Sequence, residues 1–224
     1  MTDRKIDACS VIVATGHARI CDLDPCQHGK DFFCPGISRE TGAIVASQVD
    51  RVLLTEDDIW RVLTRISHEI LEQNRGAHDL VLVGIQTRGV HLARRLAGNI
   101  EKFEGFAPAV GSLDPRLWRD DPDRASGQPL QPSEIPTEVT DRPVVIVDDV
   151  LYTGRTVRAA LEALLDFGRA KRIQLAVLVD RGHRELPIRP DFVGKNIPTA
   201  RGERVQVRIL EVDGEDAVVL GRES

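Results

Sequence analysis

The sequence predicts an α/β fold in which a mainly parallel, twisted sheet is flanked by helices. Three short and almost unbroken apolar runs, residues 80–85, 143–147 and 173–179, have the character of strands buried on both faces. The first two runs each lead into a segment whose apolar residues recur at helical spacing. Strands that alternate with helices in this way indicate βαβ units, which form parallel sheets covered by helices.

A helix is expected before the first of these strands. Thr55 is a suitable N-cap residue, because its hydroxyl can accept a hydrogen bond from a free backbone N–H of the first turn. Apolar residues then recur at helical spacing, at Ile59, Leu63, Ile66 and Ile70. The helix should end near residues 74–76, where Gly76 follows two polar residues.

The strand at 80–85 should be followed by a second helix and then by an irregular segment. Apolar residues on one face of that helix are Leu92, Leu96, Ile100 and Phe103. Residues 107–110 are the next candidate strand, and residues 111–141 are rich in Pro, Asp and Ser without apolar periodicity. Irregular loops of this length are uncommon in compact domains and are commonly functional or disordered.

The last third of the chain continues the pattern and then changes. Gly154 opens a helix that Gly168 closes, with an apolar face formed by Val157, Leu161, Leu164 and Leu165. After the strand at 173–179, proline-rich loops lead to alternating apolar residues over 205–209, a turn at 213–214 and a final run at 218–220. We expect a small C-terminal cap there.

Composition bounds the organisation of the chain. With 224 residues, 42% of them hydrophobic, it can bury one ordinary core. We expect a single domain over residues 48–224 and a flexible N-terminal extension over residues 1–47. All four cysteines lie in that extension, at Cys9, Cys21, Cys26 and Cys34, and their spacing does not match the paired ligands of a zinc site. A start of translation upstream of the true one would equally explain the extension.

Charge and hydropathy exclude two classes of protein. The formal net charge of −5 argues against a uniformly basic nucleic-acid binder, so any RNA contact must be confined to one face. No apolar run approaches the length of a membrane span, and the N-terminus carries no signal-like stretch. We therefore expect a cytoplasmic protein without membrane contact.

The most informative segment is residues 144–156, in which an apolar strand runs into paired carboxylates and then a turn rich in hydroxyl groups. Asp148 and Asp149 can accept hydrogen bonds from neighbouring sugar hydroxyls. Thr153, Gly154 and Thr156 can surround a phosphate at the start of a helix, where backbone N–H groups are free. Together these groups suit a ribose 5-phosphate.

This segment resembles the phosphoribosyl diphosphate (PRPP) signature of type I phosphoribosyltransferases. More narrowly, the chain resembles the PyrR family of bifunctional pyr operon attenuation regulators and uracil phosphoribosyltransferases. The stretches that carry the resemblance are residues 63–70, 84–89, 148–159 and 174–198. It covers roughly residues 48–224, and the first 47 residues inherit nothing from it.

The resemblance implies a type I phosphoribosyltransferase fold, with residues 111–141 as a mobile lid in which Arg116 and Arg119 are candidates to close over phosphates. The loop at 84–89 would hold the diphosphate and often contains a strained non-proline cis peptide, with Arg88 supplying charge and Gly89 leaving room for the ligand. The implied PRPP- and UMP-binding residues are Thr87, Arg88, Asp148, Asp149, Val150, Leu151, Tyr152, Thr153, Gly154, Arg155 and Thr156.

The resemblance also implies catalytic roles for Asp148, Asp149 and Arg119, and places the nucleobase near Arg181 and Val193. Cleavage at the sugar carbon builds positive charge on the sugar and negative charge on the diphosphate. Mg²⁺ that arrives with PRPP suits this chemistry, since it takes oxygen ligands from phosphate, sugar and water rather than from a dedicated set of protein ligands. The sequence offers no compelling protein nucleophile.

RNA binding is the second implied activity, with UMP favouring capture of the leader mRNA of pyrimidine genes. Opposite the apolar stripe of the first helix, a polar face carries Arg61, Thr64, Arg65 and His68. Gln73 departs from the pattern, because a basic residue is expected there in some relatives. Three hypotheses stay open: a bifunctional attenuator and transferase, a salvage transferase without an RNA role, and a nucleotide-sensing RNA binder with little catalysis. PRPP, uracil and UMP are the expected small-molecule partners, and the resemblance suggests a homodimer or a larger homo-oligomer.

Overall fold

The computed structural model describes residues 51–120 and 129–222. The expected N-terminal extension over residues 1–47, its four cysteines and its boundary with the main domain lie outside the described residues. None of the described helices is long and apolar enough to cross a membrane.

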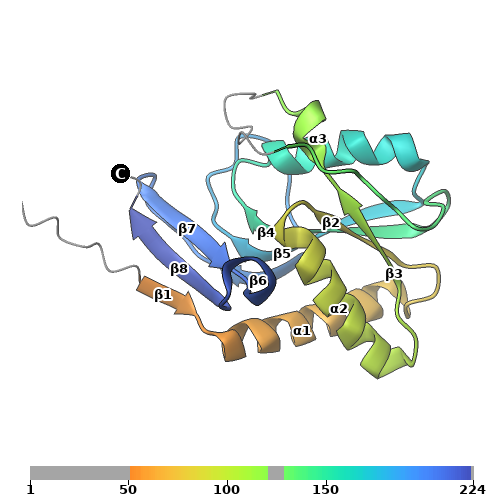
Figure 1. The fold of residues 1–224 in the computed structure, drawn as a ribbon, viewed down its shortest axis with the longest axis horizontal. Coiled ribbons are helices and arrows are strands. Elements are labelled where there is room, and N and C mark those ends of the chain that lie inside the picture. Colours follow the sequence, from red (N-terminus) through yellow and green to blue (C-terminus); the bar gives the residue numbers. More distant parts are fainter. Residues whose placement is uncertain (1–50, 121–128, 223–224) are drawn as a thin grey trace, which may run out of the picture. The chain divides into compact units, whose positions relative to one another are not determined.

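The centre of the fold is a five-stranded sheet with strand order β3-β2-β4-β5-β6, in which every neighbouring pair is parallel (Figure 1). Its strands are β2 (Val81–Ile85), β3 (Ala109–Leu113), β4 (Pro143–Leu151), β5 (Arg172–Asp180) and β6 (Phe192–Asn196). The predicted α/β class with a mainly parallel sheet is confirmed.

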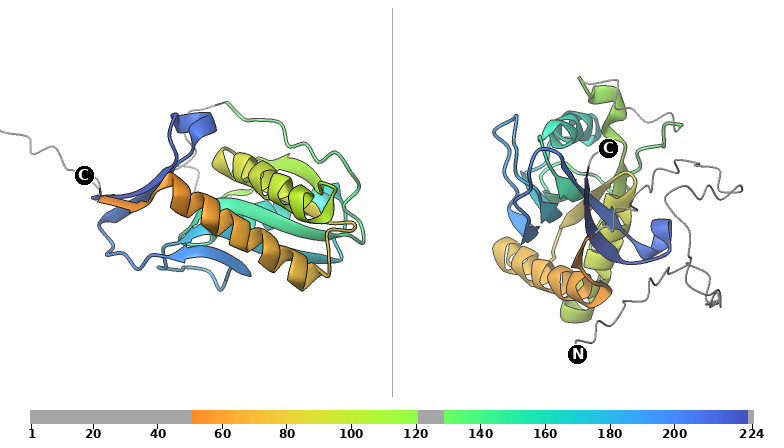
Figure 2. Two further views of the ribbon diagram at one scale, coloured as in Figure 1. Left: turned by 90° about the horizontal axis from the view of Figure 1, so that it is seen from below. Right: turned by 90° about the vertical axis from the view of Figure 1, so that its left-hand side faces the viewer.

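Helices cover both faces of this sheet (Figure 2). On one face lie α1 (Glu56–Asn74) and α2 (Arg88–Glu104), and on the other lies α3 (Arg155–Leu164). The predicted cap of α1 is confirmed: the Thr55 hydroxyl accepts a hydrogen bond from the Asp58 N–H, and the Asp58 carboxylate accepts one from the Thr55 N–H. Gly154 precedes α3 with φ of 93°, a left-handed conformation that favours glycine.

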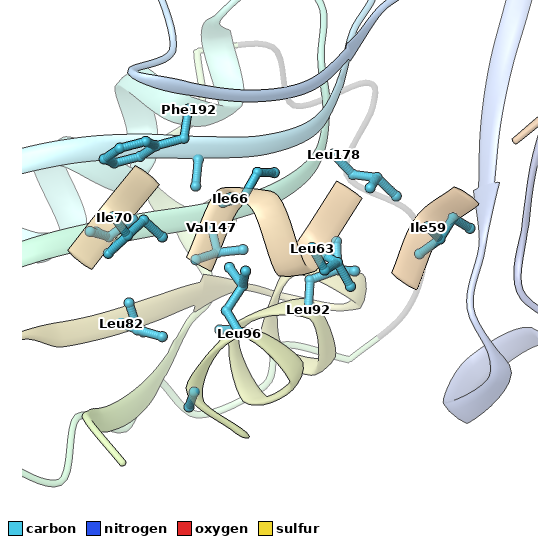
Figure 3. Packing of buried hydrophobic residues seen from close by; sticks show 14 of the residues in the cluster. Ile59, Leu63, Ile66, Ile70, Leu82, Leu92, Leu96, Val147, Leu178 and Phe192 are labelled. Carbon is cyan, nitrogen blue, oxygen red and sulfur yellow. The ribbon is translucent and has the colours of Figure 1, made fainter. Parts of the chain in front are cut away.

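The larger core lies between the sheet and the α1–α2 layer (Figure 3). Its α1 contribution is the predicted stripe of Ile59, Leu63, Ile66 and Ile70. The prediction for α2 was right for Leu92, Leu96 and Ile100 but wrong for Phe103, whose side chain is 41% exposed. The Phe103 ring stacks on His68 of α1 with 4.0 Å between the ring centres, so it lies across the helix pair rather than in the core.

The expected C-terminal cap is present, with one strand that the sequence did not reveal. A second sheet of order β1-β8-β7 combines β7 (Glu203–Arg208) and β8 (Ala217–Arg222) with β1 (Arg51–Leu54), which precedes α1 and pairs antiparallel with β8. A short helix, α4 (Leu210–Asp213), connects β7 to β8. The cap is therefore built from both ends of the domain.

Two segments differ from the sequence prediction. The strand expected over 107–110 is β3 at Ala109–Leu113, followed by the 3₁₀ turn η1 (Pro115–Trp118), and Ser112 pairs with Glu134 in an antiparallel bridge. Strand β6 was missed altogether, because it is a polar edge strand in which Phe192 is the one buried residue.

Candidate active site

The paired carboxylates lie within β4 rather than just beyond it. The strand was expected to end at residue 147, but its pairing with β5 continues to Leu151. The Asp148 carboxylate accepts a hydrogen bond from the Asp149 N–H at 2.9 Å, and the Asp149 carboxylate accepts one from the Val150 N–H at 2.8 Å. Each side chain is thus held against the backbone of the following residue.

Burial raises the pKa of both carboxyl groups. The pKa of Asp148 lies well above its ordinary value, first because the side chain is buried and second because the negative charge of Asp149 is adjacent. Burial also raises the pKa of Asp149, while the positive charge of Arg88 opposes that shift. The site therefore holds two carboxyl groups that favour a cation or hydrogen-bond donors from a ligand.

The turn that follows β4 is held by a loop from the end of β5. The Thr153 carbonyl accepts hydrogen bonds from the N–H groups of Glu185 and Leu186 at 3.0 and 3.1 Å. Arg184 donates to the Tyr152 carbonyl at 2.9 Å and pairs with Asp180 at 2.6 Å. This role of Arg184 could not be predicted from the sequence, since nothing local to Arg184 indicates a contact with the β4 turn.

A pocket of about 260 Å³ lies at this end of β4. Its walls are Asp148, Arg119 and most of the turn over residues 150–157. Arg119 enters from the end of η1 and donates to the Thr156 hydroxyl at 2.6 Å. The structure thus brings together Arg119, Asp148 and the predicted phosphate-binding turn, which are far apart in the chain.

Two arginines predicted nearby are held elsewhere. The Arg155 guanidinium pairs with Asp120 at 2.8 Å and with Glu185 at 2.7 Å, so its side chain joins the segment after η1 to the loop after β5. Arg116 forms an ion pair with Asp114 and donates to the Pro129 carbonyl. In this conformation Arg116 stabilises its own segment and does not line the pocket.

The β2–α2 loop contains the cis peptide bond expected from the resemblance, between Gln86 and Thr87. Thr87 is exposed, and Arg88 binds Asp213 of α4 through two hydrogen bonds of 3.0 and 2.7 Å. Arg88 therefore connects the cap to the loop beside Asp149.

The structure shows that the backbone packing of α2 on β4 requires a glycine at position 89. A Cβ at this position would lie 2.4 Å from the carbonyl oxygen of Val147. The glycine is needed because the first turn of α2 packs directly on β4, and this packing holds Arg88 close to the carboxylate pair.

The two residues expected at the nucleobase do not line the 260 Å³ pocket. Arg181 is buried under Tyr152, with its guanidinium carbon 4.0 Å from the ring centre, and it donates to the Thr199 hydroxyl and the Glu203 carbonyl. Val193 lies on β6, where it is paired with Val177 of β5. Arg181 thus supports Tyr152 from behind, and Val193 lies on the neighbouring edge strand.

The expected RNA face on α1 is partly engaged within the protein. Thr64 donates to the Trp60 carbonyl at 2.9 Å, and His68 stacks on Phe103. Arg65 donates to the carbonyls of Val193 and Gly194, and Arg61 is exposed. Gln73, the departure noted in the sequence, accepts a hydrogen bond from the buried Gln174 at 2.9 Å.

In the described ranges, 51–120 and 129–222, no group of three or more His, Cys, Asp or Glu residues comes together to hold a metal ion. The Asp148–Asp149 pair offers the oxygen ligands that suit a hard cation. Both carboxyl groups are buried, so their negative charge is poorly compensated by water.

Comparison with known families identifies relatives along most of the chain. Residues 53–211 match the phosphoribosyl transferase domain family. The chain is 56% identical to the bifunctional protein PyrR of Bacillus velezensis over 172 residues, which cover 75% of this chain and 95% of that protein. It is 59% identical to the bifunctional protein PyrR of Pelotomaculum thermopropionicum over 169 residues, which cover 75% of this chain and 93% of the relative.

Solved structures agree on the fold. A hypoxanthine phosphoribosyltransferase from Staphylococcus aureus is similar with a TM-score of 0.56 and 20% identity, covering 80% of this chain and 96% of that one. A hypoxanthine phosphoribosyl transferase from Trypanosoma cruzi has a TM-score of 0.59 and 18% identity, covering 79% and 93% of the two chains. At these identities the likeness concerns the type I phosphoribosyltransferase architecture alone.

Proposed function

The chain belongs to the PyrR family of phosphoribosyl transferase domain proteins, and from this membership we propose that it joins two activities. It transfers phosphoribosyl from PRPP to uracil, giving UMP and diphosphate. It is also a UMP-responsive RNA-binding regulator of pyrimidine biosynthesis genes, and its RNA partner is a leader mRNA of those genes.

The observation that carries the proposal is the geometry at the end of β4. The buried carboxyl group of Asp148 and a hydroxyl-rich turn at the start of α3 share one pocket with Arg119, and Asp149 is the next residue of β4. The turn offers Thr153, Gly154 and Thr156 to the 5-phosphate, where α3 also presents its first N–H groups. Asp148 and Asp149 then face the ribose hydroxyls and accept hydrogen bonds from them.

The reaction exchanges one bond at ribose C1 for another. The bond from C1 to the diphosphate oxygen breaks and its electron pair leaves with diphosphate, a bond forms from C1 to uracil N1, and the N1 proton is released. The carboxylates lie where positive charge on the sugar is stabilised, and Arg119 and Arg88 supply positive charge for the phosphates. For Arg88 this role requires that it contact the diphosphate beside, or instead of, Asp213.

Mg²⁺ is the proposed cofactor and is bound together with PRPP. The resemblance to type I phosphoribosyltransferases implies this ion, and oxygen donors from the ligand and from Asp148 and Asp149 fit it. When bound, the ion neutralises negative charge on the diphosphate. The raised pKa values of the carboxyl groups support this assignment, because an arriving cation favours their ionised form.

The nucleobase is proposed to lie between Tyr152 and β6. The Arg181 guanidinium lies against the ring of Tyr152. The small apolar side chain of Val193 packs against the same hydrophobic cluster as Ile188. A small neutral base such as uracil suits these contacts. The proposed RNA face is the α1 surface that carries Arg61, Thr64, Arg65 and His68, and a homodimer or larger homo-oligomer is the proposed state.

Two assays on one preparation test the proposal. Purified full-length protein is incubated with PRPP, Mg²⁺ and each of uracil, hypoxanthine, guanine and adenine, and nucleotide products are separated. We expect UMP and no purine nucleotide. Leader RNA of a pyrimidine gene is then titrated with and without UMP, and tighter binding with UMP is expected. UMP formation without RNA binding would favour a salvage transferase, and UMP-dependent RNA binding without transfer would favour a nucleotide sensor.

A further inference from the structure

Arg65 makes a long-range contact that its place on the predicted RNA face does not require. Its Nη2 donates to the Val193 carbonyl at 2.9 Å and to the Gly194 carbonyl at 2.7 Å, and its Nη1 pairs with Glu69 at 2.5 Å. One end of the guanidinium is thus fixed to β6, the strand proposed to lie beside the nucleobase.

The contact between α1 and β6 leaves no free space at this point. A Cβ on Gly194 would lie 2.3 Å from the Leu178 carbonyl oxygen and 2.6 Å from Cγ1 of Val62 on α1. Within residues 51–120 and 129–222, β6 is the last strand of the sheet, and Arg65 supplies hydrogen-bond donors to two of its carbonyls. A small shift of β6 must therefore change the position of the Arg65 side chain.

Arg65 also retains groups for a second partner. Its side chain is 47% exposed. The bonds to Val193, Gly194 and Glu69 use Nη2 and part of Nη1, so within the described residues its Nε–H and a second Nη1–H remain for an additional acceptor. A phosphate oxygen of RNA is such an acceptor.

We propose that Arg65 is a positioning residue that couples the nucleobase side of the active site to the RNA face of α1. It holds the Val193 and Gly194 carbonyls of β6 and presents its exposed N–H groups to an RNA phosphate. This inference rests on the proposed function, and it names the path by which UMP alters RNA affinity.

The physical basis is preorganisation. A base bound against Val193 restricts β6, and β6 in turn restricts the Arg65 guanidinium, so that less conformational freedom is lost when RNA binds. Coupling between two binding sites is reciprocal. RNA must therefore strengthen UMP binding by the same factor by which UMP strengthens RNA binding.

The test compares Arg65→Lys and Arg65→Ala with Arg61→Ala in the full chain. Lysine keeps the positive charge but cannot hold two carbonyls with a planar fork. Arg61 is exposed on the same helix one turn away and forms no hydrogen bond to β6 within the described part of the chain, so Arg61→Ala is the matched control. The readout is the ratio of the Kd for labelled leader RNA without UMP to that with saturating UMP, at fixed salt.

Both Arg65 variants should lose the effect of UMP, lowering this ratio by about fivefold or more, the low end of typical coupling between sites. Both variants should also raise KM for uracil more than they lower kcat. Arg61→Ala should weaken RNA binding equally with and without UMP.

If Arg65→Lys and Arg65→Ala keep the wild-type ratio of Kd without UMP to Kd with UMP, the inference is overturned. This holds also if both variants keep that ratio and show only a lower melting temperature. That result differs from failure of the proposed function, in which the wild-type protein itself would form no UMP or bind no leader RNA. UMP affinity measured with and without RNA gives the reciprocal check, and it should lose its RNA dependence in the Arg65 variants alone.

Discussion

At the scale of single residues, the Asp148–Asp149 pair is proposed to bind PRPP, and it lowers the stability of the ligand-free fold. Asp148 is only 7% exposed, and its carboxyl group lies beside that of Asp149. A site designed for stability alone would not place two carboxyl groups there, because each disfavours ionisation of the other. Their retention is understandable if sugar hydroxyls and a cation compensate them when PRPP binds.

Replacing Asp148 with Asn should therefore stabilise the ligand-free fold. Burial, and then the charge of Asp149, raise the pKa of Asp148 in the folded state, so the folded protein binds more protons than the unfolded chain between the ordinary aspartate pKa and the raised one. The free energy of unfolding of the wild type therefore falls as pH rises through this window. Asn does not titrate, so the contribution of this position does not fall in the variant. Asn can also still accept the hydrogen bond from the Asp149 N–H.

Thermal unfolding at several pH values checks this. Asp148→Asn should melt above the wild type at pH 7, by roughly 2–4 °C for each kcal/mol gained in a domain of this size. The gain should vanish below the ordinary aspartate pKa, where the wild-type carboxyl is protonated in both states. A variant that melts lower than the wild type at pH 7 would contradict the pKa direction.

At the scale of helices and strands, the contact between α2 and β4 sets the spacing of the site. Gly89 lies against the Val147 carbonyl, and the following residues of β4 are the carboxylates. Gly84, at the other side of this loop, is equally constrained, since a Cβ there would lie 2.3 Å from Cα of Val90. The β2–α2 loop, which is proposed to bind the diphosphate, is thus shaped by backbone packing.

Gly89→Ala should damage this arrangement, whereas Gly98→Ala in the same helix should not. The first places a methyl group 2.4 Å from a backbone oxygen that cannot rotate away, and the second meets no atom within 4 Å. We expect Gly89→Ala to lower stability by about 1–3 kcal/mol, as overpacking typically does. Gly98→Ala should raise it by roughly 0.4–1 kcal/mol. Chemical denaturation of both variants measures the difference, and similar stabilities would refute the packing argument.

The proposed RNA face of α1 leads to a separate prediction about how RNA affinity depends on salt concentration. If Arg61 contacts an RNA phosphate, Arg61→Ala removes one released counterion and should lower the slope of log affinity against log salt by about 0.7 for single-stranded RNA. Leader-RNA titrations at several salt concentrations give the slope. A slope equal to that of the wild type would show that Arg61 does not contact an RNA phosphate. Arg65 is unsuited to this test because of its bonds to β6.

Elements with a local pattern were predictable, and those defined by distant contacts were not. The strands β2, β4 and β5 are visible in the sequence as apolar runs. Thr55, through its capping hydroxyl, and Gly154, through its positive φ, mark the starts of helices. Strand β6 lacks such a run, because an edge strand needs burial on fewer sides. The bonds from Arg88 to Asp213 and from Arg65 to Val193 join residues 125 and 128 positions apart, for which no spacing in the sequence gives a signal.

At the scale of the whole molecule, ion pairs from α2 add to the contacts between the cap and the main domain. Arg88 and Arg95 of α2 bind the acidic residues of the β7–β8 connection: Arg88 pairs with Asp213, and Arg95 pairs with Glu211 at 2.6 Å and Asp216 at 2.8 Å. The pair between Arg88 and Asp213 places α4 of the cap beside the β2–α2 loop. The cap also includes β1, so this sheet uses residues from Arg51 onward.

Removing residues 1–44 should therefore leave uracil transfer intact. The family match starts at residue 53, and the first element of the described structure, β1, starts at Arg51. We expect kcat and KM within about twofold of the full chain, which is a difference of under roughly 0.5 kcal/mol in the barrier. The assay is UMP formation by both forms at matched concentration. A folded but inactive truncated protein would show that the extension takes part in the site.

The central claim is that the β4 carboxylates bind the ribose of PRPP, and the most direct test is uracil-dependent diphosphate release by Asp148→Asn combined with Asp149→Asn. Asn keeps the size of both side chains but removes their charge, so the fold should persist while transition-state stabilisation is lost. We predict a fall in kcat/KM for PRPP of at least about 100-fold, equivalent to roughly 2.7 kcal/mol, in a variant whose circular dichroism and melting match a folded protein. Unchanged kcat/KM for PRPP in that variant would contradict the assignment of this site.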